Sequence, residues 1–391
     1  MTKTNVKIYY CPEDYFISQL PKGSISLSGL LDEIDYESRQ HTHKITQSGE
    51  TMDTTPKPIR EIKNMSISSA EFFRLSDSGL NGFKSILSSM KISNIFAQNP
   101  PESILKIFKE SKKYNLKIER YEYKAFDINH LEQFKKHFDD KILGQKNVKD
   151  ALSRGLYKTA KGYNNKKPLT VLFYGPTGVG KTETAKFIAE IIGQELFRKQ
   201  FSMYQNNSFS DYLFGASHTS SSFAKDLLDR QSNVILLDEF DKANNLFYSA
   251  FYQLFDEGLF VDKNYSVDMS NTLIVCTSNY SSPQEIRQHL GEPLSSRFSA
   301  FIKYAPLDQA AKTTIIKQKI NEIYESYPEG IRQSIDKNEI EQRFISTLYK
   351  SSNVREITAY IEQIMSSSIL ASVEEKSDNG NTSLPETAEP I

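Results

Sequence analysis

One segment constrains the fold of this chain more than any other: GPTGVGKT, residues 175–182. It matches the pattern G-x-x-x-x-G-K-[ST], it follows the apolar segment LTVLFY, and it precedes TETAKFIAEII, whose apolar spacing predicts a helix. A strand, a glycine-rich turn and a helix in this order form a loop whose backbone N–H groups can surround a triphosphate at a helix N-terminus. The sequence therefore predicts an α/β domain with a nucleotide site.

The chemistry of this loop predicts the contacts and the cofactors, ATP and Mg²⁺. Lys181 would reach the β and γ phosphates, and the Thr182 hydroxyl would ligate Mg²⁺. The residues expected to bind the nucleotide here are Gly175, Pro176, Thr177, Gly178, Val179, Gly180, Lys181, Thr182 and Glu183. The alternative, a glycine-rich turn with a surface lysine, does not explain the strand before it and the helix after it.

A second motif, VILLDE at residues 234–239, indicates hydrolysis rather than binding alone. Four apolar residues predict a buried strand, and the carboxylate pair stands at its end. Asp238 would hold Mg²⁺ through water, and Glu239 would orient and deprotonate the attacking water. By itself an Asp-Glu pair would indicate only a solvated strand end, but its place after this strand and after the phosphate loop favours a catalytic role.

The order of elements around these motifs predicts the domain organisation. Apolar strands separated by helices indicate a parallel sheet covered on both faces. They are LTVLFY, NVILLDE, NTLIVCTSN and AFIKYAP. We expect a large α/β domain over residues 129–306, a helical small domain over 307–373, and an acidic, disordered tail over 374–391.

The region before residue 129 predicts a separate domain. Residues 70–90 and 102–114 have helical spacing, whereas 6–10 and 116–126 have strand signals, so we expect an α+β N-terminal domain over 1–128. A polar stretch between Asp35 and Lys57 holds almost no large apolar residues and predicts loop or disorder.

Composition excludes several classes of protein. The net charge is −1, which provides no global argument for a nucleic acid or a membrane surface as partner. No apolar run is long enough to span a membrane, and the N-terminus lacks the apolar core of a signal peptide. Cys11 and Cys276 form no CxxC pair. We therefore expect a soluble, cytoplasmic protein without a disulfide framework or a zinc site.

Several segments together resemble one family. Residues 142–370 are similar to the AAA+ ATPases of the Clp type, and most closely to the second ATPase module of the ClpB disaggregases. The resemblance rests on four segments in family order: ILGQKNVKDALSRGL, GPTGVGKTETAKFIAE, VILLDEFDKANNLFYSAFYQLFDEGLFVD and NTLIVCTSN. It implies a P-loop module with a helical small domain that assembles as a homo-hexamer, and it places Ile142 and Leu143 near the adenine.

The same resemblance implies roles for three further residues. Asn279 corresponds to the first sensor, which helps to position the hydrolytic water. Arg297 corresponds to the arginine finger that enters the neighbouring subunit's site, with Arg287 as a nearby competitor for this role. Arg355 corresponds to the second sensor, carried by the small domain.

The segment that should grip a polypeptide departs from the family. Clp-type unfoldases carry an aromatic–apolar–glycine loop between the two ATP motifs, whereas this chain has the shorter GASHTSSSFAKD. Phe223 is either a weakened grip or a residue that packs its helix onto the sheet. A second candidate is VDKNYSVDM, residues 261–269, which either presents Lys263 and Tyr265 to a pore or is an exposed turn. We find no docking loop for a barrel-shaped protease, so we expect no such partner.

Three functions remain open from the sequence. The first is an oligomeric ATPase that remodels or dissociates protein clients bound by the N-terminal domain. The second is an ATP-controlled switch or scaffold with one dedicated partner and no threading. The third, a nucleic-acid-linked ATPase, rests on the basic, aromatic segment 104–124, which solvated helix faces also explain, so nucleic acid is not an expected partner.

Overall fold

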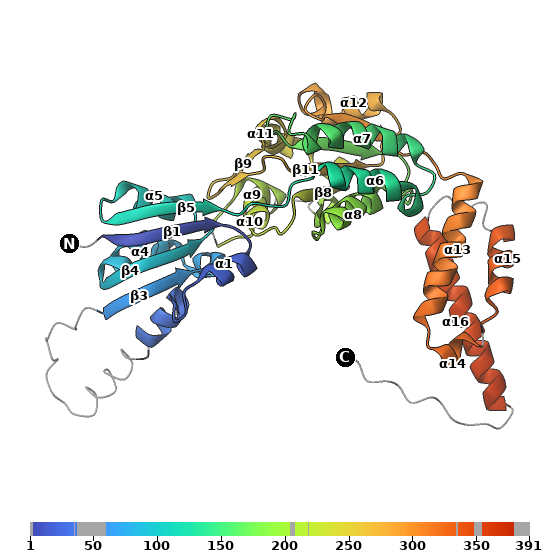
Figure 1. Ribbon diagram of the computed structural model, residues 1–391, viewed down its shortest axis with the longest axis horizontal. Coiled ribbons are helices and arrows are strands. Elements are labelled where there is room, and N and C mark those ends of the chain that lie inside the picture. The colour runs from blue at the N-terminus through green and yellow to red at the C-terminus, as the bar shows by residue number, and fades with distance from the viewer. Residues whose placement is uncertain are drawn as a thin grey trace.

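The computed structural model describes residues 3–34, 36, 60–203, 208–217, 219–333, 335–347 and 354–378. The chain forms an arch with one β-sheet at its N-terminal end, a second sheet wrapped by helices in the middle, and a group of helices at the other end (Figure 1). The predicted polar stretch from Asp35 to Lys57 lies outside the described residues, apart from residue 36. Of the predicted tail, the structure describes residues 374–378 only.

The N-terminal sheet is parallel throughout, in the order β2-β3-β4-β1-β5. Its strands are β1 (Thr4–Tyr10), β2 (Ile25–Ser26), β3 (Arg60–Ile67), β4 (Met90–Gln98) and β5 (Tyr114–Arg120). Described helices between them are α1 (Glu13–Gln19), α3 (Ser69–Arg74), α4 (Asp77–Ser88) and α5 (Glu102–Glu110).

This arrangement corrects one detail of the predicted fold class. Helices and strands are both present as predicted, but helices alternate with parallel strands, so the domain is α/β rather than α+β. Parallel neighbours need a crossover, and α4 and α5 provide it: their Phe83 and Phe108 rings pack against each other beneath the sheet, with centroids 6.2 Å apart. The partial alternation in 116–126 did not reveal which strands pair.

The central sheet has the predicted parallel arrangement, in the order β12-β6-β11-β8-β7. Its strands are β6 (Leu169–Tyr174), β7 (Phe197–Gln200), β8 (Val234–Asp238), β11 (Leu273–Ser278) and β12 (Ala300–Lys303). Every residue of β6, β8 and β11 is buried, as expected for strands covered on both faces. Because parallel strands end at the same edge, the residues that follow β6, β8 and β11 meet there.

Helices cover both faces of this sheet. One layer is formed by α6 (Ile128–Lys141), α7 (Lys146–Ala160) and α8 (Lys181–Ile192), whose apolar side chains share a core with β6. The other layer contains α9 (Ser208–Phe214), α10 (Phe223–Leu228), the 3₁₀ segment η3 (Asn245–Phe251), α11 (Tyr252–Glu257) and α12 (Pro283–Ser295). A short hairpin, β9 (Leu259–Val261) and β10 (Ser266–Asp268), extends from α11.

The C-terminal helices form a third core. They are α13 (Gln309–Ser326), α14 (Glu329–Arg332), α15 (Lys337–Thr347) and α16 (Val354–Asp378). Ile320 of α13 and Ile361 of α16 are fully buried between them. The last helix ends at Asp378, so it continues past residue 373, where the small domain was predicted to end. Within the described residues, none of the helices is both long and apolar enough to cross a membrane.

The carboxyl edge of the N-terminal sheet is docked onto the central domain through Asp229. Asn99, which follows β4, donates its side-chain N–H to Asp229 Oδ1 at 2.9 Å, and the Ser69 hydroxyl lies 3.5 Å from Oδ2. The backbone N–H of Glu102 donates to the Asn264 carbonyl at 2.9 Å, so the N-terminus of α5 also binds the β9–β10 hairpin. These polar contacts orient the two sheets relative to each other.

Candidate functional site

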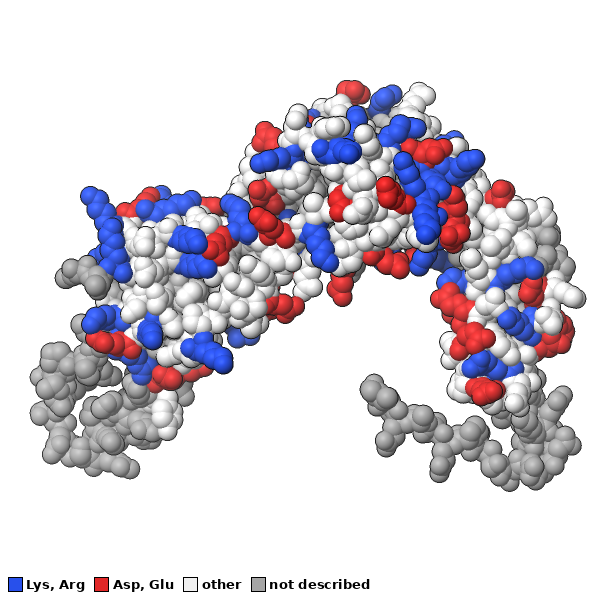
Figure 2. Space-filling view, viewed as in Figure 1, with Lys and Arg blue, Asp and Glu red and all other residues white. Residues whose placement is uncertain are grey.

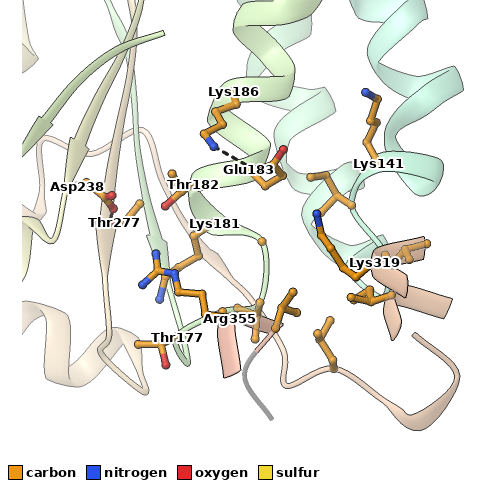
Figure 3. A pocket seen from close by; sticks show the side chains of 18 of the residues that line it. Lys141, Thr177, Lys181, Thr182, Glu183, Lys186, Asp238, Thr277, Lys319 and Arg355 are labelled. Atoms are coloured by element: carbon orange, nitrogen blue, oxygen red, sulfur yellow. Dashed lines mark hydrogen bonds and ion pairs between the residues drawn. The ribbon is translucent and has the colours of Figure 1, made fainter. Parts of the chain in front are cut away.

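A cavity of about 570 Å³ lies where α8 begins, at the carboxyl edge of the central sheet (Figure 3). The predicted residues that line it are Ile142, Leu143, Thr177, Gly178, Val179, Gly180, Lys181, Thr182, Glu183, Asp238, Glu239, Asn279 and Arg355. Gly175, Pro176 and Arg297 are not among its lining residues. Tertiary structure thus brings together in one cavity residues from the large domain and from the small domain.

The loop before α8 requires glycine at two positions. Gly175 has φ of 134°, and a Cβ built there would lie 2.4 Å from the Tyr304 carbonyl oxygen, so no other residue fits. Gly180 has φ of 101° and is the N-cap of α8. The backbone N–H groups of the first helical turn therefore face the cavity without helical acceptors, which is the geometry that binds phosphate.

Lys181 is buried against the loop. Its Nζ lies within hydrogen-bonding distance of the carbonyl oxygens of Gly175, Pro176 and Ser278, at 2.5, 3.0 and 2.8 Å, and of Asn279 Oδ1, at 3.0 Å, so its three N–H groups are shared among these acceptors. Burial lowers the pKa of Lys181 to about 8, although nearby carboxylates oppose this shift. A buried ammonium group at a helix N-terminus attracts anions strongly, because little solvent screens it.

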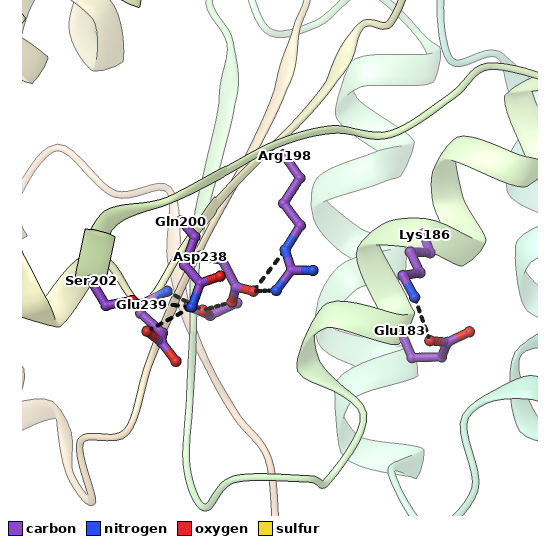
Figure 4. A network of polar contacts seen from close by, with 8 residues as sticks. Glu183, Lys186, Arg198, Gln200, Ser202, Asp238 and Glu239 are labelled. Atoms are coloured by element: carbon purple, nitrogen blue, oxygen red, sulfur yellow. Dashed lines mark hydrogen bonds and ion pairs between the residues drawn. The ribbon is translucent and has the colours of Figure 1, made fainter. Parts of the chain in front are cut away.

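The Asp238 carboxylate is held by two neighbours, of which Figure 4 labels Arg198. Arg198 of β7 donates to Oδ2 from Nη2 at 2.5 Å and from Nε at 3.0 Å, and the Thr277 hydroxyl donates to Oδ1 at 2.5 Å. Arg198 and Thr277 both line the cavity, and no sequence motif indicated either of them. The motif VILLDE does not reveal them, because β7 and β11 reach Asp238 only through sheet pairing.

Glu239 has a strained backbone and a tethered carboxylate. Its φ of 55° is left-handed, a conformation that non-glycine residues adopt at a cost and that often occurs in active sites. Gln200, at the end of β7, donates from Nε2 to Glu239 Oε2 at 3.2 Å and also to the Ser202 hydroxyl at 3.1 Å (Figure 4). The Glu239 side chain is thus oriented by a residue that the sequence did not indicate.

Residues from other elements complete the cavity. Arg355, at the start of α16, lies next to Lys181 in Figure 3, and its charge contributes to the lowered pKa of that lysine. Ile142 is buried beside the loop, and the adjacent Gln145 exchanges two hydrogen bonds with the Ala305 backbone, at 2.8 and 3.1 Å. The segment predicted to contact adenine is therefore attached to the end of β12.

Arg297 lies outside this cavity. Its Nε donates to Asp256 Oδ2 at 2.7 Å, and its guanidinium lies over the Tyr252 ring, 4.5 Å from the centroid. Arg287 is exposed on α12 and is likewise not a lining residue. Neither arginine contacts the nucleotide site of its own chain, as an arginine finger requires, and the choice between them stays a prediction.

Phe223 does not form an exposed grip, so that interpretation is wrong. The side chain is fully buried, and its ring packs edge-on against Phe260 with centroids 4.9 Å apart and contacts Phe251 and Tyr212 at 6.0 Å each. Ser222 caps α10 by accepting from the Lys225 N–H. The aromatic residue between the two ATP motifs therefore packs its helix onto the sheet.

The second grip candidate is also corrected in part. Tyr265 is buried, with 3% of its surface exposed, whereas Lys263 is exposed. The Lys263 N–H donates to the Phe214 carbonyl at 2.9 Å, and the neighbouring Asn264 carbonyl accepts from α5 of the N-terminal domain. The hairpin is thus fixed between two domains, and it does not present a tyrosine.

Comparison with known proteins agrees with this geometry. The AAA domain family (Cdc48 subfamily) matches residues 166–344. The ATP-dependent Clp protease ATP-binding subunit ClpL of Staphylococcus aureus strain bovine RF122 / ET3-1 is 27% identical over 223 residues, which are 51% of this chain and 32% of the relative. The same subunit of strain MRSA252 is also 27% identical over 223 residues.

A solved structure shares the fold. The closed state of Hsp104 with ATPγS and FITC casein superposes with a TM-score of 0.52 at 15% identity, covering 96% of this chain and 89% of that one. The cavity and the sheet around it have the architecture of a P-loop nucleotide-binding module. The family model and the curated relatives that this chain resembles support a Clp-type AAA+ ATPase, as the sequence predicted. The chain spans about a third of the length of the curated relatives that it matches, 32%.

Proposed function

We propose that this chain binds ATP with Mg²⁺ and hydrolyses it to ADP and phosphate. The observation that carries the proposal is the single cavity that holds Lys181, Asp238, Glu239, Asn279 and Arg355. A lysine and a helix N-terminus bind phosphates, and a carboxylate beyond them activates water, which are the parts that phosphoryl transfer requires.

The residues of the cavity fit a magnesium ion. Thr182 provides a hydroxyl and Asp238 a buried carboxylate, and oxygen ligands of this kind are those that Mg²⁺ prefers. When bound, the ion would neutralise charge on the β and γ phosphates. Arg198 already contacts Asp238, so it holds the carboxylate in one orientation and limits its rotation.

The general base of this proposal is Glu239. Gln200 donates to one carboxylate oxygen and leaves the other to accept a proton from the attacking water, the general-base role. Asn279 accepts from Lys181 through Oδ1, so its side-chain N–H₂ group can donate to the water or to the γ phosphate. Arg355 would bind the phosphates from the small domain and couple its closure to the nucleotide.

We propose that the active form is a homo-hexameric ring. Arg297 lies outside the site of its own chain, which is consistent with a finger that completes the site of a neighbour. The ring would remodel or dissociate protein clients in the cytoplasm, with clients recruited by the N-terminal domain. One relative is an ATP-binding subunit of a Clp protease and another structure contains casein, which makes a protein client a reasonable choice. A barrel protease is not part of the proposal.

A second candidate function is favoured by one observation. Phe223 and Tyr265, the two aromatic residues that the sequence offered as grips, are both buried. An ATP-controlled switch or scaffold with one dedicated partner needs no such grip. Nucleic acid is not proposed as a partner, and Figure 2 shows Lys and Arg side chains interspersed with Asp and Glu over the face in view.

A substrate trap tests these proposals. A Glu239→Gln variant should bind ATP without hydrolysing it, and mass spectrometry would identify the proteins that it retains in its own cell. A Lys181→Ala, Glu239→Gln double variant is the matched control for nucleotide binding. Many retained proteins would support remodelling, and one stoichiometric partner would support the switch. Unchanged ATPase activity of Glu239→Gln would refute the proposed catalytic role.

A further inference from the structure

A second cavity, of about 420 Å³, lies where the N-terminal sheet meets the central domain. It shares no lining residue with the nucleotide cavity. One wall is formed by Tyr10, the last residue of β1, and by residues 120–123 at and after the end of β5. The other wall comes from the central domain, including Arg230, Asp268 and Asn271. Its volume is within the range of about 300–1,000 Å³ that is usual for small-molecule sites.

This cavity lies outside the carboxyl ends of β1 and β5. In open α/β folds, ligands bind outside the carboxyl ends of parallel strands. Tyr10 and Arg120 are paired residues at the ends of β1 and β5, and Figure 1 shows both strands pointing toward the central domain. On the other side of β1, next to β4, Asp229 of the central domain already binds Asn99. The central domain therefore fills the space at the end of β4 but leaves a cavity at the ends of β1 and β5.

Arg230 is a buried cation that forms no salt bridge with the described residues, although the charge of the nearby Asp268 acts on it. Only 5% of its surface is exposed, and its guanidinium donates to two backbone carbonyls, Leu227 at 2.6 Å and Asp268 at 3.3 Å. Its Nε has no hydrogen-bond partner, and no carboxylate of the described residues lies within salt-bridge distance. A buried charge without a salt bridge is costly, and an anion in the adjoining cavity would offset this cost.

Further cations line the same cavity. Arg120 is exposed at the end of β5, and its guanidinium lies 4.7 Å from the Tyr10 ring centroid. Lys166 is exposed on the loop before β6. Lys and Arg outnumber the lining carboxylates, which are Glu122 and Asp268, and one Asp268 oxygen already accepts from the Ser270 N–H at 2.9 Å. The balance of charge in the cavity is therefore positive.

Tyrosines provide flat apolar walls beside these cations. The Tyr121 and Tyr123 rings pack edge-on with centroids 4.9 Å apart, and Arg230 lies over the Tyr123 ring at 4.1 Å. Burial raises the pKa of Tyr10 to about 12, so its phenol is neutral and can donate a hydrogen bond at physiological pH. Aromatic faces of this kind pack against planar groups.

We propose that this cavity binds a small organic anion with a planar ring. A phosphate or carboxylate group pairs with Arg120 and with the guanidinium of Arg230, and the ring packs against the tyrosines. Because the ligand contacts both walls, it also strengthens the docking of the N-terminal sheet on the central domain. The proposal does not depend on the function proposed for the nucleotide site.

Isothermal titration of the full chain with four probes tests it. Phenyl phosphate and benzoate combine a ring with an anion, inorganic phosphate has the charge alone, and phenol has the ring alone. We expect saturable binding of phenyl phosphate or benzoate, retained in a Lys181→Ala background that removes phosphate binding at the other site. The tighter of these two probes identifies the anionic group, and inorganic phosphate and phenol should bind more weakly.

An exposed arginine makes the test specific. Arg120→Ala should weaken binding of the tighter probe by about tenfold or more, since it removes a charge-assisted hydrogen bond. Lys112→Ala, an exposed lysine just before β5 and outside the cavity, is the matched control and should bind as the parent chain does. Circular dichroism would verify that both variants fold. Absence of saturable binding by both aromatic anions, or equal affinity of the two variants, would overturn the proposal.

Discussion

Replacement of Phe223 by alanine distinguishes a core residue from a pore-lining one. The ring is fully buried and contacts Phe260, Phe251 and Tyr212. Removal of a buried phenylalanine side chain costs about 3–5 kcal/mol, because its transfer free energy is lost and a cavity remains. We therefore expect Phe223→Ala to destabilise the central domain by an amount in this range, and Phe223→Leu to do so by less.

Urea unfolding followed by far-UV circular dichroism measures this loss, since the chain has no tryptophan for fluorescence. The midpoint of the central domain's transition should fall for Phe223→Ala. Leu246→Ala is the control: Leu246 is 78% exposed, so its loss should change stability by no more than about 0.5 kcal/mol. A Phe223→Ala variant with the parent midpoint and lost client handling would refute the core assignment and restore the grip.

Three further predictions concern the site and the domain junction. Burial lowers the pKa of Lys181 to about 8, and phosphate binding favours the charged form of this lysine. The Kd for ATPγS should therefore rise above pH 8, by up to about tenfold per pH unit. A Kd that does not change between pH 7 and 9 would contradict this prediction. Gln200→Ala removes the hydrogen bond that orients the Glu239 carboxylate. In a phosphate-release assay we expect kcat for ATP to fall by about tenfold to a hundredfold, with KM nearly unchanged. A change in KM alone would show that Gln200 acts in ATP binding. Asp229→Ala leaves buried donors unpaired, so it should weaken docking of the N-terminal sheet by about 1–3 kcal/mol and speed proteolysis between residues 121 and 127. The control, Gln231→Ala, removes an exposed contact across the same junction and should not speed cleavage. Equal cleavage rates for the two variants would contradict the role of Asp229.

Site residues that lie close together in a sequence motif were predicted, whereas Arg198 and Gln200, which meet their partners only through long-range contacts, were not. GPTGVGKT was recognisable because a phosphate loop is a local structure: its glycines, lysine and helix are consecutive in the chain. Arg198 and Asp238 are 40 residues apart in the sequence, and Gln200 and Glu239 are 39 residues apart. The segment that contains one partner gives no sequence signal for the contact with the other. Such side chains can be found only after β7 is paired with β8.

The N-terminal sheet shows the same limit for the fold. Periodicity indicated β1, β5 and the helices at 70–90 and 102–114, but not β3 and β4. In the parallel register, β1 pairs with residues 89 positions further along in β4 and 110 positions further along in β5, and the direction of pairing is not encoded in either strand alone. Parallel pairing depends on the crossover helices and on the shared core of Phe83 and Phe108. An α+β interpretation was therefore reached where the domain is α/β.

The sequence by itself determined the P-loop class, the buried strands β6, β8 and β11, and the cavity residues that belong to its motifs, because motif spacing and strand burial are properties of consecutive residues. Tertiary structure alone decided the burial of Phe223, the tethering of Asp238 and Glu239, and the cavity around Arg230. The physical reason is that burial and hydrogen bonding depend on which distant segments pack together. A residue type shows what a side chain can do, and its neighbours in space decide what it does.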